Sequence, residues 1–185
     1  RLSYALDGIE QGKKIQEAVI PIVDFFLKGN NGLLYFATVR STPDYYLHAH
    51  AINACIYAIA LGIAFGYERE ALIPLAMGAL LHDVGMVKVM DLAQQKRALS
   101  PEEREVIEGH VRFNVDLLKK ITDLPAKSIL IAQHVHERYD GGGYPAGLSG
   151  KDLSEEAQIV ALCDIYEALT HPRSYRDRLS PYDAL

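Results

Sequence analysis

Apolar residues recur along this chain every three or four positions, which is the spacing of helices that bury one face. The pattern covers residues 15–26, ends near the turn residues 29–32, and resumes after Pro43 as a long apolar run to Gly66. Residues 72–81 form a further, mostly apolar segment. Alternation with a period of two, typical of strands, is weak throughout. We therefore predict helices over these segments.

Helix boundaries are clearest in the second half of the chain. The run Ser100-Pro101-Glu102-Glu103 combines a capping serine, a proline at the first helical position and a glutamate that can close a capping box. We expect this helix to reach about Lys120, and we expect two more helices over residues 125–140 and 154–170. Short connections between helices are typical of antiparallel bundles, so the predicted fold class is all-α.

Length and composition narrow the class of protein. The 185 residues favour a single domain, and 49% hydrophobic with 23% charged residues is typical of a soluble globular chain. The net charge of −5 argues against a nucleic-acid polymer as partner. The apolar run 51–66 contains Asn53 and ends in charged residues, so we interpret it as a core helix and predict no membrane span. Two cysteines, Cys55 and Cys163, exclude a disulfide scaffold and make the cytoplasm the expected location.

Seven histidines are the most informative feature of the composition, because imidazole is a common metal ligand. One of them opens the pair His82-Asp83, at the end of an apolar segment where a carboxylate needs a partner. For an isolated pair, a helix cap or a lysine would be a sufficient partner. Other expected helices, however, carry or adjoin further candidate ligands: His50, His110, His134, His136 and Asp164. Helices that each donate a nitrogen or oxygen ligand can build a site for iron, manganese, zinc or nickel.

Motifs around these residues resemble those of a known family. The H…HD…D pattern of the HD phosphohydrolase superfamily is matched by His50, His82-Asp83 and Asp164. Residues 136–145 (HERYDGGGYP) are similar to the HHExxDGxGYP motif of its HD-GYP subfamily. Residues 163–170 and 173–176 are similar to that subfamily's ADxYDALT helix and RPYR segment. The chain thus resembles an HD-GYP domain.

The resemblance covers residues 43–185 and implies an HD-domain helical bundle with a GYP loop. Residues 1–42 match no motif, and we expect a helical segment there that is either part of the same domain or a linker helix. The chain opens without a methionine and stops at an expected helix start. We therefore expect it to be part of a longer protein, with the HD-GYP domain cut short at its C-terminal end.

The resemblance also implies an activity and a cofactor. The activity is hydrolysis of cyclic di-GMP, or of a related cyclic dinucleotide, at two divalent metal ions, iron or manganese. Asp83 would bridge the two ions. The other implied ligands are His50, His82 and Asp164 for the first ion, and His110 and His136 for the second. A hydroxide shared by two such ions can attack a phosphodiester in line at neutral pH.

Roles beyond metal binding are expected as well. The candidate catalytic residues are the bridging Asp83 and Lys88, and the resemblance implies substrate-binding roles for Arg173, Arg176 and Tyr144. Guanidinium forks suit the recognition of phosphate. Tyr144 and the proline after it would form a rigid tip of the GYP loop.

The chain departs from the family at positions that bear on activity. Val135 replaces the first of two adjacent histidines, which removes one ligand of the second ion. His134 is expected to point elsewhere on an ideal helix, and the open position could be taken by water, or by His134 if the helix end is distorted. Met86 replaces a lysine that follows the HD pair, so Lys88 is the candidate to substitute for it. Tyr46 stands where members with a third metal carry a glutamate, so we expect at most two ions.

Two further replacements are milder. Residues 110–114 (HVRFN) stand where the family has its HPxxG motif, a change that is expected to alter the local turn more than the chemistry, and Glu167 replaces an aspartate conservatively. The departures leave two functions open. The first is an active phosphodiesterase. The second is a catalytically degenerate domain that senses a cyclic dinucleotide or binds a protein such as a diguanylate cyclase (GGDEF) domain through the GYP loop, with a homodimer also left open.

A third function, that of a plain HD-superfamily nucleotidase, is the weakest, because it would leave the GYP motif at residues 143–145 unexplained.

Overall fold

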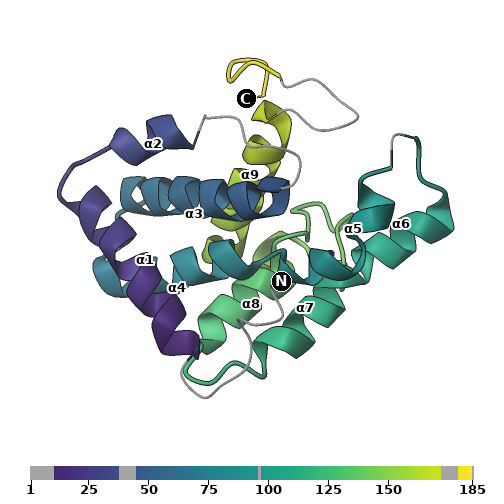
Figure 1. Cartoon of the computed structure of the whole chain (residues 1–185), viewed down its shortest axis with the longest axis horizontal. Helices are drawn as coiled ribbons and strands as arrows, with labels where there is room; N and C mark the ends of the chain where they lie inside the picture. Colours follow the sequence, from purple (N-terminus) through teal and green to yellow (C-terminus); the bar gives the residue numbers. More distant parts are fainter. Residues whose placement is uncertain (1–10, 38–44, 96, 172–178, 185) are drawn as a thin grey trace.

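The computed structural model describes residues 11–37, 45–95, 97–171 and 179–184. These residues form helices and no strand, apart from one isolated bridge between Asp140 and Ser149. The predicted all-α class is therefore confirmed. The helices in chain order are α1 (Gln11–Leu27), α2 (Gly32–Phe36), α3 (Tyr46–Ala64), α4 (Arg69–Leu81), η3 (Val84–Lys88), α5 (Met90–Ala93), α6 (Pro101–Glu108), α7 (His110–Leu118), α8 (Ala126–His134), η4 (Gly150–Asp152) and α9 (Glu155–Thr170) (Figure 1).

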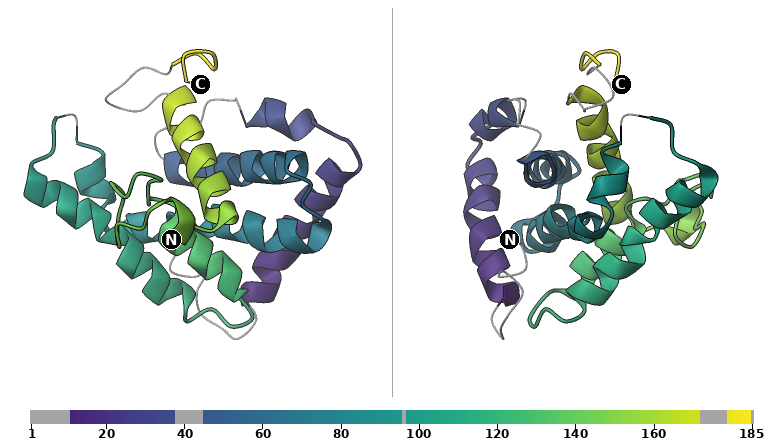
Figure 2. Two further views of the ribbon diagram at one scale, coloured as in Figure 1. Left: turned by 180° about the vertical axis from the view of Figure 1, so that it is seen from behind. Right: turned by 45° about the vertical axis from the view of Figure 1, so that its right-hand side comes forward.

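Helices α3 and α4 run side by side through the centre of the molecule (Figure 1). Helix α1 packs across α4, α8 packs against α4 as well, and α9 crosses α3 on the face that Figure 2 shows from behind. Because α1, α3, α8 and α9 all contact α4, its side chains Leu72, Leu75 and Met77 are fully buried. Helices α6 and α7 extend from this core on one side.

Two central segments, residues 46–64 and 69–88, are long and apolar enough to cross a membrane by length and composition alone. Within the 18-residue apolar window of each segment, the fold buries 44% and 61% of the residues, respectively. A helix that is apolar on most sides is also what the centre of a helical domain requires. The packing therefore supports the interpretation of the run 51–66 as a core helix.

Helix boundaries differ from the predicted ones at two places. The segment predicted as one helix from Ser100 to Lys120 is two helices, α6 and α7, which meet at Gly109. Glycine is among the poorest helix formers, so it marks a point where the helix axis can change direction at low cost. The capping box is present, with the Ser100 hydroxyl accepting from the Glu103 amide at 3.2 Å and the Glu103 carboxylate accepting from the Ser100 amide at 2.9 Å. The second difference, the early end of α8 at His134, comes from the way the GYP loop folds back on the helix end.

Candidate metal centre

Side chains from distant parts of the chain converge where α3, α4, α7 and α9 meet. The structure brings together all the ligands that the sequence suggested for two ions: His50 of α3, His82 and Asp83 at the end of α4, His110 at the start of α7, His136 just after α8, and Asp164 of α9. Local sequence explains part of the placement. The apolar α4 ends in the core, so the pair that follows it is delivered to a buried position.

The ligands form two groups that share Asp83. In the first group, His50 Nε2 lies 3.3 Å from His82 Nε2 and 3.7 Å from Asp83 Oδ2. In the second group, Asp83 Oδ1 lies 3.2 Å from His110 Nε2 and 3.1 Å from His136 Nε2. Asp83 thus directs one carboxylate oxygen to each group, which is the arrangement of a ligand that can bridge two ions.

Hydrogen bonds behind the imidazoles determine which nitrogen faces the centre. His82 Nδ1 lies 2.7 Å from the carbonyl oxygen of Ala79, and His110 Nδ1 lies 2.6 Å from that of Ile107. A carbonyl oxygen only accepts, so each Nδ1 carries a proton, and Nε2 is the nitrogen that would present a lone pair to a bound ion. The Nε2 atoms of His110 and His136 are 3.1 Å apart. Nitrogens about 2.1 Å from one ion lie roughly 3.0–3.4 Å apart, so the donor set fits a divalent cation.

Protons supply the positive charge of the cluster when no metal ion is bound. Burial disfavours the charged form of His50, but hydrogen bonds with Asp164 and Glu167 outweigh it and raise the pKa to about 10. Burial would raise the pKa of Asp83, yet the charge of His82 and further imidazole contacts hold it well below its usual range. The pKa of Asp164 is lowered against burial by His50 and His82. Both carboxylates are therefore ionised and available as ligands at neutral pH.

Glu167 belongs to the centre although the sequence suggested no role for it. Its carboxylate is buried, and Oε2 accepts a hydrogen bond from His50 Nδ1 at 2.5 Å. Oε1 accepts from Asn53 Nδ2 at 3.1 Å and lies 3.2 Å from His171 Nδ1. The bond to His50 holds the proton on Nδ1 and turns Nε2 toward the metal position. One signal could have identified Glu167: it follows Asp164 by three residues, so both lie on one face of a helix.

The GYP loop closes over the second group of ligands. Helix α8 ends at His134 rather than continuing to residue 140, because the buried Glu137 carboxylate accepts the amides of Ala146 at 2.7 Å and Leu148 at 3.0 Å. These bonds fold the loop back on the helix end. Tyr144 then stacks on the imidazole of His136, with ring centroids 5.1 Å apart and planes 17° from parallel. The predicted substrate contact Tyr144 is thus placed at the wall of the centre.

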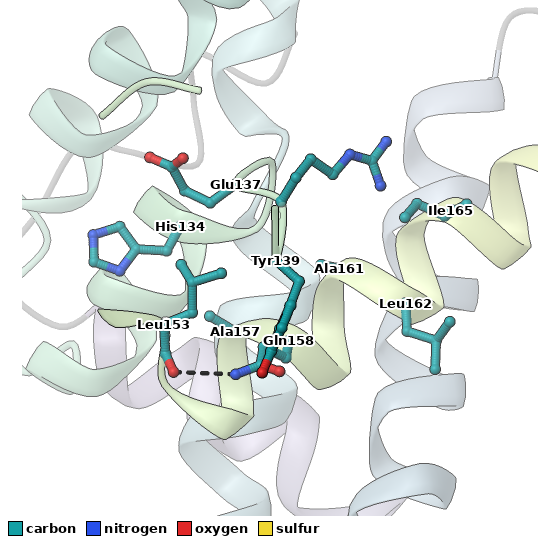
Figure 3. A pocket seen from close by; sticks show the side chains of 10 residues that line it. His134, Glu137, Tyr139, Leu153, Ala157, Gln158, Ala161, Leu162 and Ile165 are labelled. Carbon is teal, nitrogen blue, oxygen red and sulfur yellow. Dashed lines mark hydrogen bonds between the residues drawn. The ribbon is translucent and has the colours of Figure 1, made fainter. Parts of the chain in front are cut away.

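Other residues considered in the sequence lie elsewhere. His134 is one of the residues that line a separate pocket of about 210 Å³, together with residues 137–139 and side chains of α9, and it lies outside both ligand groups (Figure 3). Val135 is buried in the apolar core. The ammonium of Lys88 lies 5.1 Å from the centre of the Phe113 ring, which is the contact the structure shows for it. Arg173 and Arg176 lie outside the described residues.

Fold and site together define a helical domain with a histidine–aspartate site for divalent metal. A family profile described as "HD domain" matches residues 44–185. The chain therefore belongs to the HD domain family. The solved structure "Bd1817, a HDG"Y"P protein from Bdellovibrio bacteriovorus" shares this fold, with a TM-score of 0.76 and 24% identity over 88% of this chain and 53% of that one.

Curated relatives are similar over parts of their length. "Cyclic di-GMP phosphodiesterase PA4108" of Pseudomonas aeruginosa is 27% identical over 100% of this chain and 44% of the relative. "3'3'-cGAMP-specific phosphodiesterase 2" of Vibrio cholerae is 33% identical over 70% of this chain and 25% of the relative. The chain thus spans less than half the length of these relatives.

Proposed function

We propose that this chain is a metal-dependent phosphodiesterase domain that hydrolyses cyclic di-GMP or a related cyclic dinucleotide. One observation carries the proposal: Asp83 stands between two imidazole groups and offers one carboxylate oxygen to each. Two-metal sites of this kind suit phosphodiester hydrolysis. The names of the curated relatives, which act on cyclic di-GMP or 3'3'-cGAMP, support the substrate class.

We propose two ions, iron or manganese, held by the ligands named above. When bound, they would neutralise phosphate charge and activate water for attack. The chain's own residues prepare this chemistry. His50, His82 and His110 are almost fully buried, whereas Asp83, His136 and Asp164 keep 13%, 12% and 16% of their side-chain surface exposed. A phosphate would therefore approach from the side of these three residues, with Tyr144 bordering its path.

The test is turnover of cyclic di-GMP by purified protein loaded with manganese or iron. The expected result is release of linear dinucleotide or mononucleotide at a rate well above that of Asp83→Ala, which loses the shared ligand. Glu156→Gln is a matched control, because Glu156 forms its ion pair with Lys127 at the surface of α9. Equal rates for the wild type and Asp83→Ala would contradict the proposal.

The alternative is a degenerate domain that binds a cyclic dinucleotide without cleaving it. It is favoured by the second ligand group, where Val135 is turned into the core and Lys88 lies on Phe113. If it is correct, Met86→Lys together with Val135→His should create turnover that the wild type lacks. Met86→Lys alone is the milder variant, since a histidine at position 135 would bury an imidazole among apolar side chains. Comparable turnover by the wild type would rule the alternative out.

We also propose the wider setting of the domain. The buried, unpaired cysteines Cys55 and Cys163 support a cytoplasmic location. Helix α1 buries Val19 and Val23 against the core, which supports placing residues 1–42 in the same domain.

Light scattering would test the homodimer. Binding of a purified GGDEF domain to the wild type and to Tyr139→Ala, which alters an exposed side chain beside the GYP motif, would test the partner.

A further inference from the structure

A buried asparagine joins the two segments that carry Asp83 and His110. Asn114 of α7 has no exposed surface. Its Nδ2 donates to the carbonyl oxygens of Leu81 at 3.1 Å and His82 at 2.5 Å, and its Oδ1 accepts from the Gly85 amide at 3.1 Å. The side-chain amide of Asn114 thus donates and accepts hydrogen bonds, so its nitrogen and its oxygen both have backbone partners.

These three backbone groups lie on either side of Asp83. Leu81 and His82 stand at the end of α4, where the last carbonyls of a helix have no helical amide ahead of them. Gly85 lies in the turn that begins η3. A buried backbone group without a partner is costly, so the asparagine stabilises the one conformation of this turn in which all three are satisfied. In that conformation the Asp83 carboxylate lies between the two ligand groups.

The same helix face presents His110. Asn114 follows His110 by four residues in α7, so the two side chains project on one side. The turn also touches α7 directly: a Cβ at Gly85 would collide with the carbonyl oxygen of His110 and lie 2.9 Å from Asn114 Cβ. Asn114 therefore holds the turn against α7, and in this arrangement Asp83 Oδ1 lies 3.2 Å from His110 Nε2.

We propose that Asn114 is a positioning residue of the metal centre, which sets Asp83 against His110 and thereby forms the second ligand group. The inference rests on the proposed metal centre. A ligand shared by two ions must satisfy both distances at once, and small shifts of the supporting residues weaken such sites. The change in residues 110–114, expected from sequence to alter the local turn more than the chemistry, thus bears directly on the ligands through Asn114.

Manganese binding tests this role without reference to turnover. Wild type, Asn114→Ala and the milder Asn114→Ser are titrated with manganese chloride, at a temperature where circular dichroism shows each to be folded. We expect manganese affinity to fall roughly 10- to 100-fold in Asn114→Ala and less in Asn114→Ser, which keeps one hydroxyl donor. The electron paramagnetic resonance signal of a coupled manganese pair should decline, and that of single ions should increase.

Ser128→Ala is the matched control, because Ser128 is equally buried and its hydroxyl joins α8 to the Pro74 carbonyl at 2.9 Å, outside the ligand groups. We expect lower thermal stability in that variant and unchanged manganese affinity. Wild-type affinity in both Asn114 variants would overturn the inference, as would an equal loss in Ser128→Ala. If the wild type binds manganese no better than Asp83→Ala, the metal centre itself fails, and the positioning role fails with it.

Discussion

At the scale of single residues, the centre depends on side chains that do not face the metal positions. Glu167 contacts His50 from behind, and Asn114 contacts the backbone beside Asp83. Burial would raise the pKa of Glu167, but its hydrogen bond with His50 outweighs burial and lowers the pKa below 4.5. Glu167 is therefore a buried anion that fixes the tautomer and orientation of one imidazole.

Replacing Glu167 by glutamine should weaken metal binding. Glutamine keeps the size and one acceptor oxygen but removes the charge that makes His50 a strong ligand. We expect about a 10-fold loss of manganese affinity in isothermal titration, partly recovered in Glu167→Asp, which restores the charge. Glu156→Gln on the same helix should show no change. Wild-type affinity in Glu167→Gln would refute this role.

The same pair predicts a pH dependence for the metal-free protein. The raised pKa of His50 means that its contribution to stability is complete below pH 6.5 and is lost as pH rises through about 10. The lowered pKa of Glu167 means that its contribution is complete above pH 4.5 and is lost on further acidification. Thermal unfolding in EDTA should show the highest stability between pH 4.5 and 6.5 and a decline toward pH 10. A flat profile over this range would contradict the assignment.

At the scale of elements, close packing of α4 on α8 sets the distance between two parts of the centre. Helix α4 ends at Leu81, directly before His82, and α8 ends at His134, two residues before His136. Gly78 lies at their contact, where a Cβ would approach Ile131 Cγ2 to 2.8 Å. The absence of a side chain at this position therefore allows the two helices, and the ligands at their ends, to lie close together.

Adding a methyl group at this contact should separate the helices. We expect Gly78→Ala to lower the free energy of unfolding by about 1–3 kcal/mol, although alanine is the better helix former. Gly32→Ala in α2 is the control, because a Cβ there meets no atom closer than 4.0 Å. Chemical denaturation measures both variants. Equal stability of Gly78→Ala and the wild type would show that the contact relaxes freely.

At the scale of the whole molecule, the ligands link segments that span most of the chain, from His50 in α3 to Asp164 in α9. An ion that binds this arrangement binds the folded protein alone, so binding adds directly to the free energy of unfolding. A bound ion is therefore also expected to stabilise the packing of helices α3, α4, α7 and α9 against one another.

Metal addition should thus raise the unfolding temperature and chelation should reverse it. Manganese at 100 times its dissociation constant would add about 2.7 kcal/mol to the free energy of unfolding. Differential scanning calorimetry with manganese, and then with excess EDTA, measures the effect. Asp83→Asn should lose most of the shift. A shift of the same size in Asp83→Asn would mean that manganese binds elsewhere.

Sequence predicted the helical class and the capping box well, because each depends on local spacing or on a short motif. It also suggested His50, His82 and Asp83 as ligands, and the fold brings these three side chains into one group. It was less successful where several segments act on one residue. The early end of α8 is such a case, because it follows from the bonds that Glu137 accepts from Ala146 and Leu148. The break at Gly109 instead lies at a residue that is a poor helix former.

The sequence by itself determined that this chain is helical and that it carries imidazoles and carboxylates suited to divalent metal, since composition and periodicity are local properties. Only the tertiary structure decided that Glu167 contacts His50 and Asn114 contacts the backbone beside Asp83, while His134 lines another pocket. The physical reason is that each of these roles is a contact between segments tens of residues apart. Such contacts depend on how the helices pack together, and the spacing of residues within one helix does not determine that packing.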